Sequence, residues 1–250
     1  MTIVIPMAGR GRRFLDAGYR EPKMLIAAHG KSLLQWSVDS LPLALATRIV
    51  FICLAEHERE FALSAKIRSW YGGATRLEFL FLPDVTGGQA ETVLAAREFI
   101  AADQPLLIFN IDTAFHSSTL AQALQDTTND GVLGAFASTE PRYSFAAVDE
   151  RGRVTRVTEK EPISSHALTG LYHYRRAGDF LAVADAAVGR NERVKGEFYV
   201  APLYNALIAQ GRRFLLDACR AHYILGTPAE LAIFLALPAA KVRLDLIATP

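Results

Sequence analysis

The chain begins with an apolar segment, residues 2–7, that leads into a loop rich in glycine and arginine. Gly9 and Gly11 leave room for backbone N–H groups to approach a ligand closely. The basic residues in and after this loop are Arg10, Arg12, Arg13 and Lys23. Backbone donors and positive charge at the end of a strand predict a binding site for a polyphosphate.

Two common phosphate-binding motifs do not fit this loop. A Walker A loop requires Gly-x-x-x-x-Gly-Lys-Ser/Thr, which does not occur in the chain. A dinucleotide-binding loop requires a third glycine that seats its helix, and Phe14 stands there. The remaining alternative is a surface turn with solvated arginines. The strand before the loop, and Pro22 and Lys23 after it, favour the phosphate site.

An acidic residue follows a later apolar run and is a candidate metal ligand. Asp112 comes directly after residues 106–111, which have the composition of a buried strand. Ligands of open α/β sheets bind at the carboxyl ends of the strands, so Asp112 and the glycine-arginine loop should share one edge. A carboxylate there suits Mg²⁺. The alternative is an ordinary loop start or helix cap.

Other polar residues are ambiguous when taken alone. Gly88 and Gln89 open a helical pattern and fit either a base-binding turn or a simple helix cap. Glu159 and Lys160 end a strand before a proline, a pattern typical of an exposed turn. The six histidines have no metal-ligand spacing, and no Ser-His-Asp or Cys-His arrangement stands out.

The composition favours one α/β domain. The 250 residues are 51% hydrophobic and 21% charged, enough to bury a large core. The net charge of +1 argues against nucleic acid or an anionic membrane as a partner. Cys53 and Cys219 are expected to be small core residues in a reducing compartment. With no leader pattern and no run of membrane-spanning length, the expected location is the cytoplasm.

Apolar periodicity predicts an alternation of strands and helices in the first half of the chain. The expected strands are 2–7, 49–54, 77–82 and 106–111, and the expected helices are 32–41, 58–70 and 89–100. This order predicts a mostly parallel sheet that is covered by helices on both faces.

After Ser117, a candidate cap for a helix at 118–125, short turns replace the long crossovers. The expected strands are 131–137, 144–148, 153–158 and 169–174, which predict antiparallel additions to the sheet. Helices at 177–188 and 199–210, a strand at 213–216 and a helix from Pro228 complete the expectation.

The amino-terminal motif resembles that of the sugar-phosphate nucleotidyltransferases. Their loop reads Gly-x-Gly-Ser/Thr-Arg and is followed by Pro-Lys. The matching residues are Gly9, Gly11, Arg13, Pro22 and Lys23, and Arg12 replaces the hydroxyl residue. The resemblance implies a mostly parallel, Rossmann-like mixed sheet of the nucleotidyltransferase or GT-A type. It also implies one domain over 1–250, with a nucleotide-binding half at about 1–115 and an acceptor-binding half at about 116–250.

The activity implied by the resemblance joins a nucleoside triphosphate to a phosphorylated small acceptor and releases pyrophosphate. Arg13 and Lys23 would be catalytic, and Asp112 would hold Mg²⁺, with Mn²⁺ as the alternative. The implied nucleotide-binding residues are Met7, Ala8, Gly9, Gly11, Arg13, Gly88 and Gln89. The implied acceptor-binding residues are Glu159, Lys160, Gly170 and Glu197.

The chain looks most like the small enzymes of bacterial capsule and surface-polysaccharide pathways. Some of these activate sugars, and others use CTP to activate phosphocholine-like or phosphoglutamine-like acceptors. We therefore expect CTP first, then UTP or dTTP, and a homodimer remains open.

One departure from the family pattern leaves alternatives open. Many members have a second metal-binding Asp where this chain has Ile224, so one carboxylate must suffice or Glu197 or another acid must substitute. A glycosyltransferase of related fold would normally show Asp-x-Asp, whereas Asn110 precedes Asp112 here. A regulatory nucleotide-binding protein that has lost catalysis is the third possibility.

Overall fold

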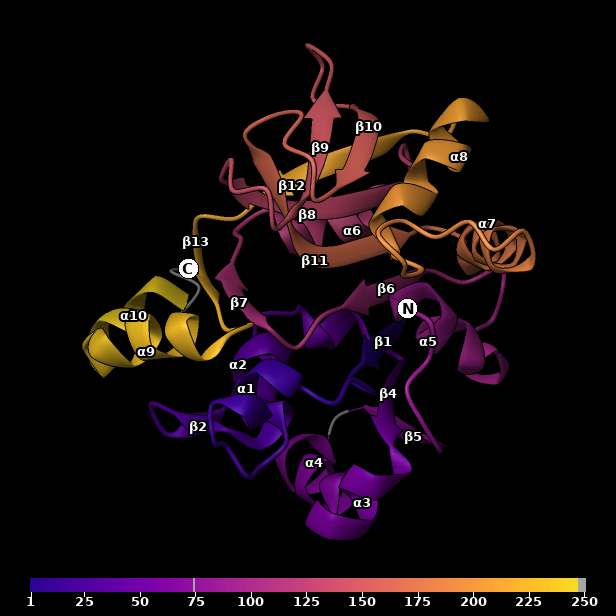
Figure 1. Ribbon diagram of the computed structural model, residues 1–250. Helices are drawn as coiled ribbons and strands as arrows, with labels where there is room; N and C mark the ends of the chain where they lie inside the picture. Colours follow the sequence, from indigo (N-terminus) through magenta and orange to yellow (C-terminus); the bar gives the residue numbers. More distant parts are fainter. Residues whose placement is uncertain (74, 247–250) are drawn as a thin grey trace.

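The computed structural model describes residues 1–73 and 75–246 and is built around a nine-stranded mixed sheet (Figure 1). One half of this sheet is parallel, in the order β6-β1-β4-β5. Its strands are β1 (Thr2–Pro6), β4 (Arg48–Leu54), β5 (Arg76–Leu82) and β6 (Leu106–Phe109). The parallel half predicted from apolar periodicity is confirmed.

The other half of the sheet is mostly antiparallel. β11 joins it to the parallel half by pairing antiparallel with β6, and β8 and β9 both pair with β11. β12 then pairs parallel with β8. The strands are β8 (Gly131–Ala137), β9 (Ser144–Val148), β10 (Val154–Glu159), β11 (His166–Tyr174) and β12 (Phe214–Ala218). The antiparallel additions are thus confirmed, and a parallel β12 extends them.

Helices cover both faces of the sheet. The α-helices up to residue 189 are α1 (Arg12–Asp16), α2 (Leu33–Val38), α3 (Ala55–Phe61), α4 (Leu63–Tyr71), α5 (Gln89–Ala95), α6 (Leu120–Gln125) and α7 (Ala177–Gly189). Along β1, Ile3 and Ile5 point to the face of α2, α4 and α6, and Val4 points to the face of α5, α7 and α8 (Tyr204–Ala209). All three side chains are fully buried. Burial on both faces explains why these strands are almost continuously apolar.

Three predicted helices are divided in the structure, and the one expected at 89–100 separates into α5 (Gln89–Ala95) and the 3-10 turn Arg97–Phe99. The helix expected at 58–70 is broken at Ala62, whose φ is +49°, and Glu58 accepts hydrogen bonds from Ser64 at the break. The helix expected at 199–210 starts only with a 3-10 turn at Ala201–Leu203, followed by α8. Tyr199 therefore lies outside that helix, in the segment that precedes it.

A second, small sheet was not predicted from the sequence. It consists of β7 (Thr113–His116), which directly follows Asp112, paired antiparallel with β13 (Ala221–Ile224). The backbone N–H of Leu225 continues the pairing by donating to the Asp112 carbonyl at 2.7 Å. This pairing brings the carboxyl-terminal part of the chain to the end of β6.

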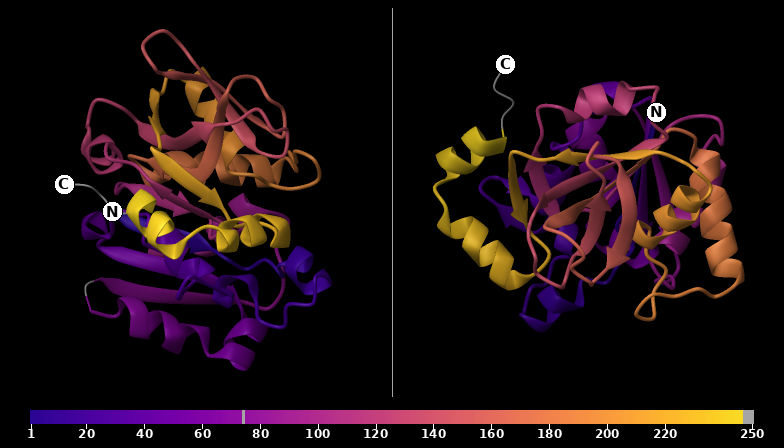
Figure 2. Two further views of the ribbon diagram at one scale, coloured as in Figure 1. Left: turned by 90° about the vertical axis from the view of Figure 1, so that its left-hand side faces the viewer. Right: turned by 90° about the horizontal axis from the view of Figure 1, so that it is seen from above.

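The last two helices, α9 (Pro228–Ala236) and α10 (Ala239–Leu246), pack against the amino-terminal third of the chain. Figure 2 shows them beside the indigo elements that follow β1. Phe14 and Trp36 share a buried cluster with Leu231 and Phe234 of α9. The remaining short elements are the 3-10 turns Lys23–Leu25, Leu43–Leu45 and Arg97–Phe99 and the hairpin β2 (Ala27–Ala28) and β3 (Lys31–Ser32).

No helix within residues 1–73 and 75–246 is both long and apolar enough to cross a membrane.

Candidate active site

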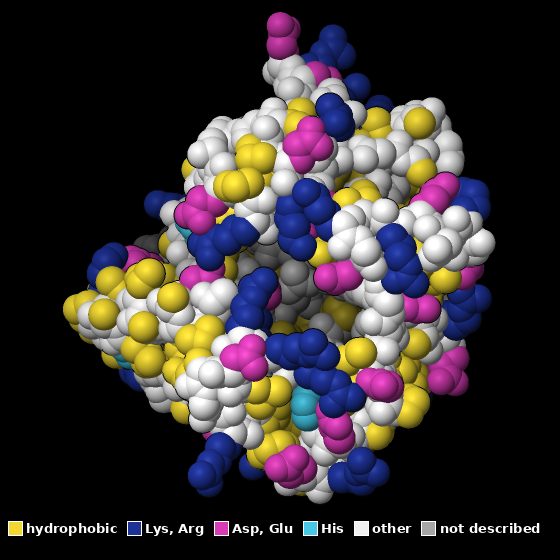
Figure 3. Space-filling model, in the orientation of Figure 1, with side chains coloured by type: hydrophobic (Ala, Val, Ile, Leu, Met, Phe, Trp, Pro, Cys, Tyr) yellow, Lys and Arg dark blue, Asp and Glu magenta, His cyan; other side chains and the backbone are white. Residues whose placement is uncertain are grey.

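A cleft of about 790 Å³ opens at the carboxyl ends of β1 and β6 and is bounded on the other side by β9, β10 and β11. Figure 3 shows the hollow in the middle of one face, bordered by Lys, Arg, Asp and Glu side chains. The candidate residues that line it are Ala8, Gly9, Arg13, Gly88, Gln89, Asp112, Glu159, Lys160, Gly170 and Glu197. Residues from opposite ends of the sequence therefore meet in one cavity.

Three candidate residues do not form the wall of the cleft directly. Met7 is buried in the core at 3% exposure, and its backbone N–H is bonded to the Ile52 carbonyl. Gly11, with φ +64°, forms the turn before α1. Lys23 reaches the cleft through its contact with Asp112. The structure thus leaves direct contact with a ligand in this loop to Ala8, Gly9 and Arg13.

The three arginines of the loop have different surroundings. Arg10 is paired with Glu56 of α3 at 2.6 Å and with Asp84 at 2.9 Å, and these contacts raise its pKa. Arg13 lines the cleft, and Arg12 does not. Phe14, which occupies the position of the third glycine in a dinucleotide loop, is buried and anchors α1. Arg13 is thus the loop arginine available to a ligand.

Lys23 and Asp112 form an ion pair at the floor of the cleft. The Lys23 Nζ lies 3.1 Å from Asp112 Oδ2, and the two side chains are 13% and 38% exposed. The pair joins the segment after Pro22 to the end of β6. A cation that contacts a lining carboxylate can hold a phosphate next to the metal ion of that carboxylate.

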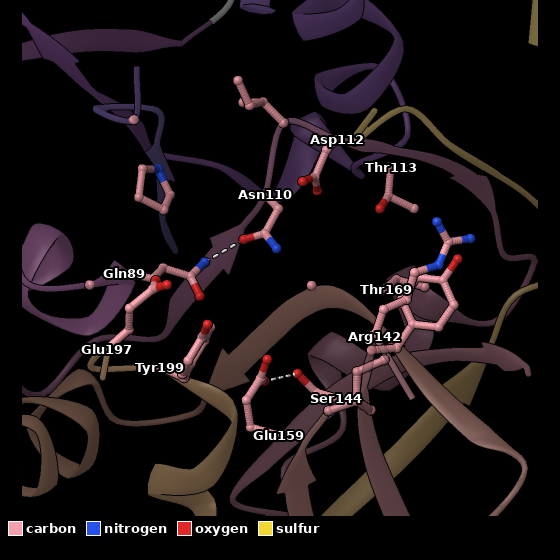
Figure 4. Close-up of a pocket in the computed structure, with 18 of the residues that line it drawn as sticks. Gln89, Asn110, Asp112, Thr113, Arg142, Ser144, Glu159, Thr169, Glu197 and Tyr199 are labelled. Carbon is pink, nitrogen blue, oxygen red and sulfur yellow. Dashed lines mark hydrogen bonds between the residues drawn. The ribbon is translucent and has the colours of Figure 1, made fainter. Parts of the chain in front are cut away.

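The Gly88–Gln89 turn is held by contacts that the sequence did not reveal. A Cβ on Gly88, whose φ is +150°, would collide with the Phe198 backbone. Gln89 donates a hydrogen bond from Nε2 to Asn110 Oδ1 (Figure 4). Gly170, with φ +85°, is required because a side chain there would collide with Asn110. Asn110 is therefore a central residue of the cleft.

Glu159 and Lys160 lie at the opposite wall. Glu159 is 8% exposed and accepts a hydrogen bond from Ser144 (Figure 4). Burial raises the pKa of Glu159, while the Ser144 hydrogen bond and the charge of Lys160 oppose this shift. The carboxyl group is therefore harder to ionise than an exposed glutamate.

Lys160 occupies a strained backbone position, with φ +56°. Its Nζ donates to the Tyr199 hydroxyl at 2.5 Å and lies 4.0 Å from Glu159 Oε1. Burial lowers the pKa of Lys160, but the Tyr199 hydrogen bond and the nearby carboxylates of Glu159 and Glu197 outweigh it and raise the pKa overall. Lys160 remains a cation at neutral pH.

Some lining residues were missed because no local pattern marks them. Arg142, in the β8–β9 connection, is 2.8 Å from Glu140 and also pairs with Glu230 of α9. Ser144 and Thr169 present hydroxyl groups to the cleft. Ser144 at the start of a strand and Arg142 in a turn look like ordinary surface residues, so their sequence context gave no signal.

The donor set at this edge fits a magnesium ion that also binds phosphate. Mg²⁺ is usually held by one or two carboxylates together with phosphates and water, and Asp112 presents such a carboxylate to the cleft. Ile224 also lines the cleft, opposite Thr113 in the small sheet. Residues 1–73 and 75–246 contain no group of three or more His, Cys, Asp or Glu side chains arranged around a metal position.

A parallel sheet with a glycine-arginine loop at its carboxyl edge, facing a second polar wall across one cleft, defines an α/β nucleotide-binding protein with room for a second small molecule. The family model described as nucleotidyl transferase matches residues 3–195, and the chain belongs to this family.

Individual relatives agree with this assignment. Glucose-1-phosphate thymidylyltransferases from two strains of Xanthomonas campestris pv. campestris are each 27% identical to this chain over 188 residues. The match covers 72% of this chain and 62% of each relative, so the chain spans less than two thirds of their length.

Solved structures show the same fold. A nucleoside-diphosphate-sugar pyrophosphorylase from Vibrio cholerae RC9 has a TM-score of 0.81 and 33% identity, over 94% of this chain and 100% of that chain. The inositol-1-phosphate CTP transferase from T. maritima has a TM-score of 0.73 and 14% identity, over 99% of this chain and 97% of that chain. The second likeness concerns the fold alone.

Proposed function

We propose that the protein transfers a nucleoside monophosphate from a nucleoside triphosphate to a phosphorylated small molecule and releases pyrophosphate. The observation that supports this most is the layout of the cleft described above. Arg13, Lys23 and Asp112 offer phosphate and metal contacts on one wall, and Glu159 and Lys160 offer hydroxyl and phosphate contacts on the other. Both substrates would thus be held in one cavity.

The reaction requires alignment and charge neutralisation rather than covalent participation of the protein. A phosphate oxygen of the acceptor attacks the α-phosphorus, and the bond from that phosphorus to the bridging oxygen of the leaving pyrophosphate breaks. Arg13 neutralises the leaving pyrophosphate, and Lys23 neutralises the α-phosphate. When bound at Asp112, Mg²⁺ would add further charge neutralisation at the phosphates.

The other wall orients the acceptor. Glu159 can accept hydrogen bonds from acceptor hydroxyls, and its contact with Ser144 fixes its side chain. Lys160 provides the cation for the acceptor phosphate, and Glu197 and Gly170 complete this subsite. Ala8, Gly9, Gly88 and Gln89 hold the nucleotide from the first wall.

We propose that the enzyme prefers CTP, followed by UTP or dTTP. We also propose that it acts in bacterial surface-polysaccharide synthesis. The amide of Gln89 is suited to the hydrogen-bonding edge of a pyrimidine. The curated relatives are named as thymidylyltransferases, which supports a pyrimidine nucleotide.

Pyrophosphate release tests the proposal. CTP, UTP, dTTP, ATP and GTP are each combined with Mg²⁺ and a panel of sugar 1-phosphates and of phosphocholine-like and phosphoglutamine-like acceptors. We expect release with a pyrimidine nucleotide and one acceptor class, and none when the acceptor is omitted. Consumption of a nucleotide sugar without pyrophosphate would instead indicate a glycosyltransferase. Nucleotide binding without any turnover would indicate a regulatory protein.

A further inference from the structure

Glu230 lies near Asp112 in the lining of the cleft, and one of its carboxylate oxygens is buried. It stands in the first turn of α9, where its backbone N–H donates to the capping Thr227 Oγ1 at 3.2 Å. Its side chain is only 10% exposed, yet the residue lines the cleft. Glu230 Oε1 pairs with Arg142, whereas the buried Oε2 has no hydrogen-bond partner in the described part of the chain.

The position of this free oxygen can be described relative to Gly226. A Cβ built on Gly226 would lie 3.2 Å from Glu230 Oε2 and 3.6 Å from Asp112 Oδ2. The two carboxylate oxygens therefore flank the same point beside Gly226. The absence of a side chain at this glycine keeps the space between them open.

A buried carboxylate oxygen without a partner is unfavourable, because it has lost its hydration and gained nothing in exchange. Arg142 pairs with Oε1, while Oε2 and Asp112 Oδ2 lie 3.2 Å and 3.6 Å from the point beside Gly226. A hard cation between Glu230 Oε2 and the Asp112 carboxylate, whose Oδ2 also contacts Lys23 at 3.1 Å, would relieve this cost at Glu230. Mg²⁺ typically uses one or two carboxylates and completes its coordination with phosphate and water.

We propose that Glu230 is the second carboxylate of a divalent-metal site, in place of an acid at Ile224. It would act with Asp112, either by direct coordination or through a bound water. The proposal deepens the proposed function, since the same metal would serve the nucleotide phosphates. It also accounts for an isoleucine at a position where similar proteins often have an acid.

The competing interpretation is that Glu230 serves only to hold Arg142. Glu140 provides the matched control for that interpretation, because it also contacts Arg142, at 2.8 Å, but does not line the cleft. A role through Arg142 predicts similar effects for Glu140→Gln, Glu230→Gln and Arg142→Met. A role in metal binding predicts an effect of Glu230→Gln alone among these three.

The test is a titration with Mn²⁺, followed by electron paramagnetic resonance, with the metal alone and with a non-hydrolysable nucleotide analogue. We expect Glu230→Gln to weaken Mn²⁺ binding by about 10-fold or more, as Asp112→Asn should. Glu140→Gln and Arg142→Met should bind Mn²⁺ as the wild type does. Thermal melting checks that each variant is folded, and Glu230→Asp, which keeps a carboxylate, should recover part of the affinity.

A double variant provides an independent readout. Ile224→Asp in the Glu230→Gln background places an acid on β13 at the same wall and should restore Mn²⁺ binding. Wild-type affinity in Glu230→Gln, or an equal loss in Arg142→Met, would overturn the proposal. Failure of the proposed function would be seen differently, as an absence of turnover. Mn²⁺ binding is measured without turnover, and nucleotide binding can be followed separately.

Discussion

At the scale of single residues, the charged side chains in and near the cleft differ in what they contact. Arg10 forms ion pairs with Glu56 and Asp84, whereas Arg13 lines the cleft. Lys23 reaches the same cleft through its ion pair with Asp112. Of the three arginines in this loop, Arg10 is thus paired with acidic residues, Arg13 lines the cleft, and Arg12 is exposed outside it.

We expect Arg13→Ala to lower kcat/KM for pyrophosphate release by about 100-fold or more, because it removes a charge aimed at the leaving group. The free energy of unfolding should change little, since an exposed arginine contributes little packing. Steady-state kinetics and urea unfolding measure both effects. Arg12→Ala is the matched control and should retain activity. Equal activities of the two variants would contradict the assignment of Arg13.

The raised pKa of Glu159 predicts a particular pH dependence of stability. Burial favours the protonated carboxyl in the folded protein, so the folded state binds more protons than the unfolded state. Stability that is present below the ordinary carboxyl pKa should therefore be lost as the pH rises through the folded value. We expect the wild type to become less stable relative to Glu159→Gln over that range. Urea unfolding at a series of pH values measures this difference.

The control for this pH effect is Glu161→Gln. Its side chain is 63% exposed and lies 3.7 Å from Arg156, and an exposed ion pair contributes little, so this substitution should change the free energy of unfolding little. A difference between wild type and Glu159→Gln that is constant with pH would contradict the argument.

The residues that sequence analysis found share a local signal, and those it missed do not. Arg13 belongs to a motif, and Asp112 ends an apolar run, so both could be predicted. Asn110 acquires its role from Gln89 and Gly170, which are distant in sequence. Glu230 acquires its role only because the pairing of β13 with β7 brings the start of α9 beside Asp112.

At the scale of elements, the turn at Gly88 is joined to the segment before α8. Phe198 donates its backbone N–H to the Gly87 carbonyl at 3.0 Å and accepts from Ala90 at 2.8 Å. Arg193 donates to the carbonyls of Gly87 and Gly196, at 3.2 Å each, and its guanidinium lies 4.0 Å from the Phe198 ring centre. The proposed base turn and the acceptor segment are therefore mechanically connected.

We expect Arg193→Met to raise the KM of both substrates by about 2- to 10-fold, since it removes hydrogen bonds that hold both segments. The kcat should change less, because no reacting group is lost. Arg190→Met is the matched control, as Arg190 pairs only with Glu192 at the surface, at 2.6 Å. A change confined to one substrate would show that the two segments act independently.

The strands were predicted more accurately than the helices, because periodicity does not show where a helix ends or breaks. The strand at 144–148 coincides with β9, and the strands of the parallel half differ from prediction only at their ends. The break at Ala62 depends on a side-chain cap from Glu58, which periodicity does not reveal. β7 and β13 are short, and their pairing joins residues far apart, so neither had a pattern of its own.

At the scale of the whole molecule, the carboxyl-terminal helices tie the two sides of the cleft together. β13 pairs with β7, and α9 then packs on the elements that follow the phosphate loop. The apolar cluster between them contains Phe14 of α1, Trp36 of α2 and Phe234 of α9. The two halves of the sequence therefore do not correspond to the two walls of the cleft, because the carboxyl-terminal segment packs against amino-terminal elements.

Phe234 provides a test of this closure. It is 1% exposed, and its ring lies 5.5 Å from Trp36 and 5.1 Å from Tyr223. Phe234→Ala should lower the free energy of unfolding by about 3–5 kcal/mol, the usual cost of deleting a buried aromatic side chain. Phe234→Ala should also weaken Mn²⁺ binding, since α9 carries Glu230.

The control is Ile233, the neighbour of Phe234 in the sequence. Ile233 is 69% exposed, so Ile233→Ala should change the unfolding free energy by no more than about 0.5 kcal/mol. Urea unfolding and Mn²⁺ titration of the two variants separate loss of closure from a general effect of shortening a side chain on α9. Equal stabilities would mean that α9 does not hold the two sides of the cleft together.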